Sequence, residues 1–384
     1  MKILGLIVEY NPFHNGHIYH IKKAKEIIQP DYTIAIMSSS FVQRGEPAII
    51  DKWKRSEIAL QYGVDLVIEL PFVYACQSAD YFAKGAIQLL NAIGVSDICF
   101  GSESGHIETF IEIAHAIDNN QAFYNHLVKE SMQKGSRYAD ACNSALKKIM
   151  HKEVRTPNDL LGLSYVKEII LNHYPITPHC IQRTNDFHHS ELSSIASAST
   201  IRKAIYKQED ISHTLPFDEL YKNEIYCFDD FFPYLQYQVL TSTAEELKNY
   251  HMVDEGLENL LIAKISVSHQ MEDIVQGLLS KRYTRPRIQR MIIHILMKNT
   301  KKEITKAMNV DYLRILSMNE KGRTYLNMIK KECPYHLVTN FSNYQHPALT
   351  LEFKATKLLS LLSQRPEDII KEEYAHIPLK KDSQ

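Results

Sequence analysis

The feature that most constrains the fold is an alternation of strand-like and helix-like segments in the first hundred residues. Continuous runs rich in Val, Ile and Leu are typical of strands buried on both faces. Between them, apolar residues recur at helical spacing. An alternation of this kind predicts a parallel sheet covered by helices, with ligands at the carboxyl ends of the strands. The strand-like runs are 2–10, 32–37, 65–71 and 96–102, and the helix-like segments are 18–28, 53–63 and 78–94.

Similar patterns continue to about residue 207. Pro157 and Asn158 are start signals for one further helix, and Ser or Thr caps another. One more apolar run can form a fifth strand. We therefore predict an α/β, Rossmann-like parallel-sheet domain over residues 1–215. The later segments are 107–150, 156–170 and 197–207, which read as helical, and the strand-like 176–183.

The composition changes near residues 208–225, where the chain becomes acidic and rich in aromatic residues. Beyond this point amphipathic helical patterns dominate, and residues 335–341 ("YHLVTNF") read as a candidate strand. A chain of 384 residues suggests two domains. We predict that residues 216–384 form a mostly α-helical second domain.

Bulk composition narrows the class of protein. Hydrophobic residues make up 45% and charged residues 23% of the chain, as in ordinary globular proteins. The net charge is −1, so any contact with nucleic acid must come from a local patch. We find no apolar segment long enough for a membrane span and no signal-peptide cleavage site. Six scattered cysteines without a CxxC motif indicate reduced thiols and a cytoplasmic protein.

The stretch "EYNPFHNGH", residues 9–17, lies where the first strand leads into the first helix. Backbone N–H groups at a helix start are unpaired and favour an anion, and Gly16 lets the backbone approach a ligand closely. We interpret the turn as a phosphate cradle in which His14 and His17 donate to phosphate oxygens, with neither residue in the core. Two alternatives stay open: a metal site, for which no further ligands are evident, and loop histidines without chemistry.

A basic stretch, "SKRYTRPRIQR", spans residues 280–290 and contains no acidic residue. It could be a solvated helix start whose arginines cover apolar surface. It could equally grip an RNA phosphate backbone, with Tyr283 beside the charges. The cations concerned are Lys281, Arg282, Arg285, Arg287 and Arg290.

Several motifs together resemble a known family. "GLIVEYNPFHNGH" is similar to the first signature of the nucleotidyltransferase superfamily with HIGH-type motifs, and "SASTIR" to its second. The ordered set of motifs resembles, over most of the chain, the bacterial tRNA(Met) cytidine acetate ligase family. The further motifs of that set are "FVQRGEPAI" (41–49), "FGSE" (100–103), "PNDLLGLSY" (157–165) and "KRYTRPRIQR" (281–290).

The resemblance implies a ligase reaction in two steps. ATP and acetate would give acetyl-adenylate and pyrophosphate, and the acetyl group would then pass to N4 of the wobble cytidine, C34, of elongator tRNA(Met). ATP is therefore an expected substrate. Mg²⁺ is expected to arrive with the phosphates, held largely by them and by waters. No tightly bound cofactor, protein metal site or membrane is implied, and the sequence leaves the oligomeric state open.

The resemblance also implies site residues. His14 and His17 would be catalytic because they stabilise the charge that develops on the leaving pyrophosphate. Ser199, Thr200 and Arg202 of the second signature are a candidate phosphate-binding set, and the five cations of residues 281–290 would bind tRNA. The implied ATP contacts are Ile7, Val8, Glu9, Tyr10, Asn11, Pro12, Phe13, His14, Asn15, Gly16, His17, Ile18, Tyr19, His20, Gly101, Asn158 and Arg183.

Some features leave other interpretations open. Without the resemblance, Gly101 could be a turn glycine, Asn158 a helix cap and Arg183 a member of a surface ion pair. The family usually has a Gly–Asn pair before "FVQRGEP", whereas this chain has Ser at position 40, and "SASTIR" has no lysine of the KMSKS type. The alternative functions are a small-cofactor adenylyltransferase and a non-catalytic RNA-binding protein.

Overall fold

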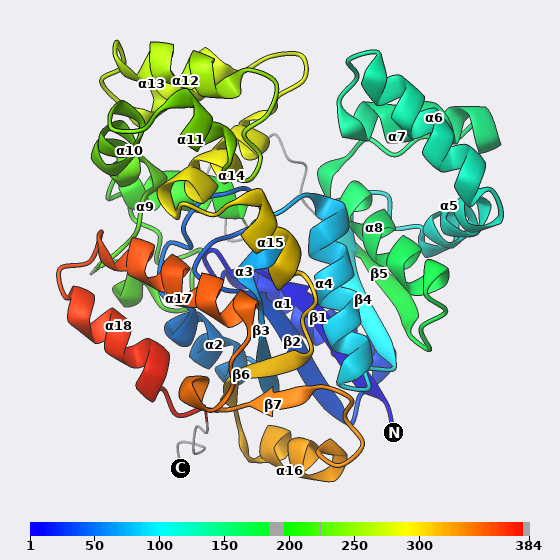
Figure 1. Cartoon of the computed structure of the whole chain (residues 1–384). Helices are drawn as coiled ribbons and strands as arrows, with labels where there is room; N and C mark the ends of the chain where they lie inside the picture. Colours follow the sequence, from blue (N-terminus) through cyan, green and yellow to red (C-terminus); the bar gives the residue numbers. More distant parts are fainter. Residues whose placement is uncertain (184–195, 223, 379–384) are drawn as a thin grey trace.

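A seven-stranded sheet forms the centre of the computed structural model, which describes residues 1–183, 196–222 and 224–378 (Figure 1). The strand order is β5-β4-β1-β2-β3-β6-β7, and β1 to β5 pair in parallel. Each of these five strands falls within or nearly on a predicted run, so the predicted Rossmann-like parallel sheet is confirmed. The five strands are β1 (Ile3–Val8), β2 (Tyr32–Ser38), β3 (Leu66–Leu70), β4 (Asp97–Ser102) and β5 (Thr177–Gln182).

Helices cover both faces of this sheet (Figure 1). Apolar residues of α1, α2 and α9 pack on one face with Leu4 and Leu6 of β1. Those of α4 and α8 pack on the other face with Ile34 and Ile36 of β2. The helices of this part of the chain are α1 (Asn15–Ile28), α2 (Lys52–Gln61), α3 (Phe72–Ala75), α4 (Ala79–Ala92), α5 (Ile107–Asn119), α6 (Gln121–Gln133), α7 (Tyr138–Met150), α8 (Pro157–Leu171) and α9 (Ala198–Tyr206).

The C-terminal region is mostly helical, as predicted. None of the described helices in either region combines the length and apolarity that crossing a membrane requires. The α-helices are α10 (Phe232–Leu240), α11 (Ala244–Lys248), α12 (Leu257–Ile265), α13 (Met271–Leu278), α14 (Arg285–Leu296), α15 (Lys301–Ala307), α16 (Glu320–Ile329), α17 (Pro347–Ser360) and α18 (Pro366–Ala375). Short 3₁₀ helices are η1 (Asp218–Tyr221), η2 (Phe228–Phe231) and η3 (Phe341–Asn343).

Two strands of the C-terminal region extend the central sheet. β7 (His336–Val338) lies within the predicted run 335–341 and pairs in parallel with β6 (Tyr312–Met318). β6 pairs antiparallel with β3 and was not predicted, because Arg314 interrupts its apolar run. The division of the chain near residue 215 stays a prediction.

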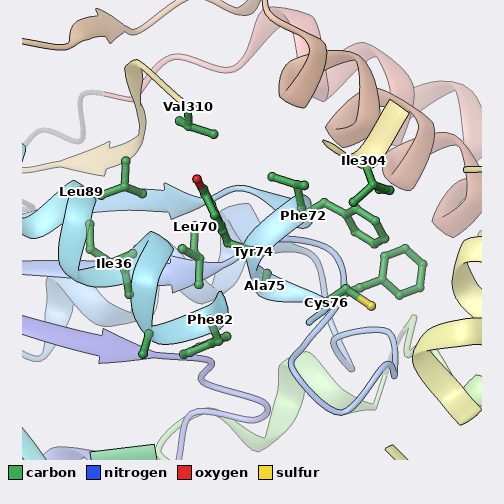
Figure 2. Close-up of a cluster of buried hydrophobic side chains, with 14 of the residues drawn as sticks. Ile36, Leu70, Phe72, Tyr74, Ala75, Cys76, Phe82, Leu89, Ile304 and Val310 are labelled. Carbon is green, nitrogen blue, oxygen red and sulfur yellow. The ribbon is translucent and has the colours of Figure 1, made fainter. Parts of the chain in front are cut away.

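The two regions also share apolar contacts. Figure 2 shows Phe72 and Tyr74 of α3 beside Ile304 of α15 and Val310, which belong to the C-terminal region. The Tyr74 hydroxyl donates to the carbonyl of Met308. The short helix α3 is therefore held between the sheet and the C-terminal helices.

A buried cluster of charges connects α2, α17 and α18 to strands β3 and β6 of the sheet. The Lys52 ammonium lies 2.5 Å from a Glu69 oxygen and 2.9 Å from a Glu373 oxygen, and Arg314 pairs with the same two carboxylates. Glu352 is the third carboxylate, 3.8 Å from Lys52. Three carboxylates face only two cations among these groups, and burial, followed by Glu69, raises the pKa of Glu352 to about 8.

We expect Glu352→Gln to flatten the pH dependence of stability. Between pH 4.5 and about 8 the native Glu352 keeps a proton that the unfolded chain releases, so stability falls as pH rises through this range. Glutamine removes that titration. Urea unfolding at pH 5 to 9 measures the free energy of unfolding of both proteins as a function of pH. As a contrast, Glu373→Gln should lose about 3–5 kcal/mol at pH 7, because it removes an ionised partner of buried cations. Parallel pH profiles for wild type and Glu352→Gln would contradict the assignment.

Candidate active site

The candidate site lies at the switch point of the sheet. β1 is flanked by β2 on one side and β4 on the other, so the strand order reverses between β1 and β4. Open α/β sheets bind ligands in the crevice outside the carboxyl ends of the strands at such a point. The residues 9–17 follow directly on the carboxyl end of β1, as predicted, and α1 begins at Asn15.

The two histidines form a reciprocal cap on α1. The ring Nδ1 of His14 accepts from the backbone N–H of Gly16 at 3.1 Å. The ring Nδ1 of His17 accepts from the backbone N–H of His14 at 3.2 Å. The rings stack with their centroids 3.8 Å apart. The motif HxGH is therefore a capping arrangement, in which each ring satisfies one of the unpaired N–H groups of the helix start.

This cap determines where the imidazole protons lie. Because each Nδ1 accepts a hydrogen bond, a neutral ring carries its proton on Nε2. Burial, followed by the charge of Arg183, lowers the pKa of His14 to about 4. Burial, followed by His14, His20 and Arg183, lowers the pKa of His17 well below its ordinary value. At neutral pH both rings are therefore uncharged and have an Nε2–H group to donate.

One expectation about these residues is wrong. We predicted that neither histidine would lie in the core, but His14 is only 8% exposed. The reason is that its ring folds back over the helix start to reach Gly16, where the turn and α1 cover it.

The metal alternative gains no support from this geometry. Both Nδ1 atoms are already occupied by backbone N–H groups, and the rings of His14 and His17 stack rather than converge on one point. Within residues 1–183, 196–222 and 224–378, no group of three or more His, Cys, Asp or Glu side chains could hold an ion. The site is therefore built from N–H donors and a nearby guanidinium, which suits an anion.

Arg183 supplies the positive charge. It follows β5, and its backbone N–H donates to the carbonyl of Ser102 at 2.8 Å. Its side chain crosses Gly101 so closely that a Cβ added there would lie 3.4 Å from Cγ of Arg183. The charge of Arg183 acts on His14, His17 and His20, so it lies near the start of α1. The structure thus brings these predicted ATP contacts together across the switch point.

Asn158 belongs to a hydrogen-bond network that joins the start of α8 to the end of β4. Its side-chain amide donates to Glu103 at 2.6 Å, and the backbone N–H of Asp159 donates to the same carboxylate at 2.9 Å. In return, the Ser102 hydroxyl donates to Asp159 at 2.6 Å. Glu103 and Asp159 were not predicted as site residues, although both lie in the motifs "FGSE" and "PNDLL". The Glu103 carboxylate accepts hydrogen bonds from α8 and the Asp159 carboxylate accepts one from the end of β4, and together they position Asn158 and the end of β4.

Several residues of the predicted range 7–20 lie inside the protein. Tyr10 and Phe13 are each 1% exposed, and Asn11 is 3% exposed. The Tyr10 and Phe13 rings pack on each other at 4.8 Å and on the His17 ring at 4.9 and 5.6 Å. These side chains therefore support the histidine turn, and whether they also contact ATP stays a prediction.

The second signature supports the same turn. α9 carries "STIR", and Ser197 caps it by accepting from the backbone N–H of Thr200 at 3.2 Å. Arg202 donates to the carbonyl of Asn11 at 2.7 Å and to Glu46 at 3.2 Å. Among the predicted phosphate-binding residues, Arg202 thus holds the backbone of the first signature. Ser199 is exposed at the start of α9.

Arg55 is a supporting residue that the sequence analysis missed. It is fully buried in α2 and donates to the carbonyl groups of Glu9 at 2.7 Å, Ser38 at 3.0 Å and Ile50 at 3.2 Å, and also to that of Ser39. One guanidinium therefore joins the carboxyl ends of β1 and β2. No local signal marked it, because it lies in an ordinary helical pattern among other charged residues.

The predicted tRNA-binding cations divide into two groups. Three of them pair with acidic groups on the surface: Arg282 with Glu255 at 2.6 Å, Arg285 with Glu272 at 2.8 Å, and Arg287 near Asp254 at 3.5 Å. Exposed pairs of this kind are weak, so RNA phosphates can compete for the guanidinium groups. The members of the surface group are Lys281, Arg282, Arg285 and Arg287.

Arg290 forms the second group and does not fit the predicted role. It is 8% exposed and donates to the carbonyl of Gln43 at 2.9 Å. The neighbouring Gln289 donates to Glu46 at 3.1 Å. Gly45, at φ +81°, lies so close that an added Cβ would be 2.3 Å from the Arg290 backbone nitrogen. Because Arg290 holds the loop 41–49 against α14 in the interior, we remove it from the tRNA-binding set.

The parallel sheet and the histidine turn at its switch point are features of nucleotide-binding enzymes, and comparison with known proteins identifies the family. The family model described as "HIGH Nucleotidyl Transferase" matches residues 1–373. The tRNA(Met) cytidine acetate ligase of Bacillus subtilis is 40% identical over 100% of this chain and 98% of its own length. That of Oceanobacillus iheyensis is 42% identical over 93% of this chain and 94% of its own.

Solved structures show the same relationship. The crystal structure of Thermotoga maritima TmcAL bound with alpha-thio ATP has a TM-score of 0.88 and 32% identity, covering 99% of this chain and 100% of its own. The apo form has a TM-score of 0.89. The chain is thus a HIGH-type nucleotidyl transferase by family and fold. Within that class, the chain belongs to the tRNA(Met) cytidine acetate ligase family.

Proposed function

We propose that this protein is an ATP-dependent tRNA(Met) cytidine acetate ligase. It activates acetate as acetyl-adenylate and transfers the acetyl group to N4 of the wobble cytidine, C34, of elongator tRNA(Met). The observation that carries the proposal is the anion site at the switch point, in a chain that its named relatives match over nearly their full length. Six free cysteines, two of them buried, suit a reducing compartment, so we place the enzyme in the cytoplasm.

The first step needs stabilisation of a leaving group more than a base. Acetate is already ionised at neutral pH, and its oxygen attacks the α-phosphorus while the bond to pyrophosphate breaks. Negative charge then grows on the β-phosphate oxygens. We assign its stabilisation to the Nε2–H groups of His14 and His17 and to the charge of Arg183, with the dipole of α1 adding to both. Mg²⁺ on the ATP phosphates would neutralise part of the same charge.

The second step needs correct placement of RNA. The exocyclic amine of cytidine attacks the carbonyl carbon of acetyl-adenylate, AMP leaves, and the amine loses a proton. Holding the amine at that carbon supplies much of the rate in reactions of this kind. The surface cations Lys281, Arg282, Arg285 and Arg287 are our candidates for holding the tRNA.

Two assays on one enzyme preparation test the proposal. Acetate should be required for ATP–pyrophosphate exchange in the absence of tRNA. After incubation with ATP, acetate and unmodified tRNA(Met), mass spectrometry of the nucleosides should show N4-acetylcytidine. Exchange that needs a phosphorylated cofactor in place of acetate would indicate a small-cofactor adenylyltransferase, and no exchange with any acid would indicate a non-catalytic RNA-binding protein.

We expect Gly101→Val to weaken ATP binding while Gly101→Ala has little effect. An added Cβ would lie 3.4 Å from Cγ of Arg183, which is ordinary contact, whereas the valine methyl groups need space that Arg183 occupies. Displacing one charge-assisted contact should raise the KM for ATP in the exchange assay about tenfold. Equal KM values for both variants would show that Arg183 does not hold ATP through this approach.

A further inference from the structure

A pocket lies where α6 and α7 meet the basic loop before α14. Arg137, at the start of α7, joins the two by donating to the carbonyl of Lys281 at 2.6 Å. The pocket has a volume of about 330 Å³, within the range of small-ligand sites. Apart from Arg282, its lining includes none of the residues assigned to the sites above.

The lining offers groups for the base and for the phosphate of a nucleotide. Tyr138 is 44% exposed and presents aromatic surface on which a base can stack, whereas Tyr124, also in the lining, is buried. Gln133 carries an amide that can donate to and accept from the edge of a base. Lys129 and Arg282 supply charge for a phosphate. The described lining residues include no Asp or Glu, which argues against a cationic ligand.

Polar groups surround the two tyrosine hydroxyls. Burial, followed by Asp80 and Cys142, raises the pKa of Tyr138, and burial, followed by Cys142, raises the pKa of Tyr124. Asp80 in turn pairs with Lys167 of α8. The Tyr138 ring is packed among these groups and needs little ordering when a base stacks on it.

The position of the pocket suits the RNA substrate. Figure 1 shows helices α5–α7 and α10–α14 as two groups at the end of the molecule toward which β1 runs. The bond from Arg137 to Lys281 joins the two groups. RNA that reaches the carboxyl ends of the strands from this end therefore passes close to this junction.

We propose that this pocket binds one unpaired nucleotide of the tRNA substrate, distinct from the cytidine that reacts. The inference rests on the proposed function for the identity of the RNA. Single-stranded segments are the parts of RNA whose bases are free to stack on aromatic side chains, because paired bases keep theirs inside the helix.

Charge reversal in the pocket tests the proposal without disturbing the fold. Lys129 of α6 and Lys134, the residue that follows this helix, are both exposed, but only Lys129 lines the pocket. Lys129→Glu should weaken equilibrium binding of a tRNA(Met) transcript about tenfold, and the matched control Lys134→Glu much less. Neither change should alter acetate-dependent exchange without tRNA, since both lie outside the ATP site.

Stacking is tested at Tyr138. Tyr138→Ala should raise the Kd for tRNA about tenfold, as removal of one base–aromatic stack does. Tyr138→Phe should restore binding to within about twofold, since the ring is retained. The control Phe123→Ala removes an aromatic side chain that is 54% exposed outside the pocket and should have no effect.

The outcomes separate the two proposals. If Lys129→Glu and Tyr138→Ala bind tRNA as their controls do, the pocket proposal is overturned. Equal losses with a fully paired RNA duplex would also overturn it, because no unpaired base is then involved. A change in oligomeric mass in Lys129→Glu would identify a second copy of the chain as the occupant instead. Wild type that binds tRNA in a pocket-dependent way but forms no N4-acetylcytidine would sink the proposed function alone.

Discussion

His14→Ala and His17→Ala will each slow acetyl-adenylate formation by about 30-fold to 1,000-fold, which corresponds to about 2–4 kcal/mol of transition-state stabilisation. The reason is that each ring is held neutral, with its Nδ1 on a backbone N–H and its Nε2–H available to the leaving pyrophosphate. Alanine removes the donor, and water cannot replace it with the same orientation. Acetate-dependent ATP–pyrophosphate exchange measures the loss.

The cap makes a second measurement necessary, because His14→Ala also removes an acceptor for the Gly16 N–H. We expect that variant to lose about 1 kcal/mol of unfolding free energy. His14→Ser is the matched control: serine is a good helix cap but has no Nε2–H donor. It should recover most of the stability and remain as slow as His14→Ala. A His14→Ser enzyme with the wild-type exchange rate would show that the ring serves only as a cap.

Replacement of Lys281, Arg282, Arg285 and Arg287 by alanine will abolish most tRNA binding while leaving exchange without tRNA intact. Lys281 and Arg282 are exposed and Arg285 and Arg287 are half-buried, and three of the four form ion pairs that RNA phosphates can replace. Each cation removed from a phosphate should reduce the slope of log K against log salt by about one unit. Removing three such cations would lower affinity by a factor of about a hundred or more at moderate salt.

Arg290→Ala provides the contrast within the same stretch. Arg290 is buried against Gln43, so its replacement should destabilise the protein, with no change in the salt slope of tRNA binding. Binding titrations across a salt series and urea unfolding together distinguish the two groups. Unchanged affinity and slope in the fourfold variant would mean that the surface cations are only a solvated face, and the RNA surface would then lie elsewhere.

Features that depend on local patterns could be predicted from the amino-acid sequence. The strands β1 to β5 are continuous apolar runs, and the helices between them repeat every 3.6 residues; neighbouring side chains alone reveal both patterns. The histidine turn was visible for the same reason, since a strand, a glycine and a helix start lie within a few residues. The motif order then indicated the family and the ligase reaction.

The partners of charged side chains, in contrast, became known from the three-dimensional structure alone. The strand β6 was not predicted because Arg314 places a charge within its apolar run. That charge can be buried because Glu69 and Glu373, which lie far away in the sequence, neutralise it. Arg55 and Arg290 look like surface charges in a helical pattern, yet both are buried and donate to backbone carbonyl groups of distant loops. Moving a charged side chain from water into the protein interior is so costly that it can be buried only where such partners neutralise it or accept its hydrogen bonds. Partners that are distant in the sequence leave no periodic signal.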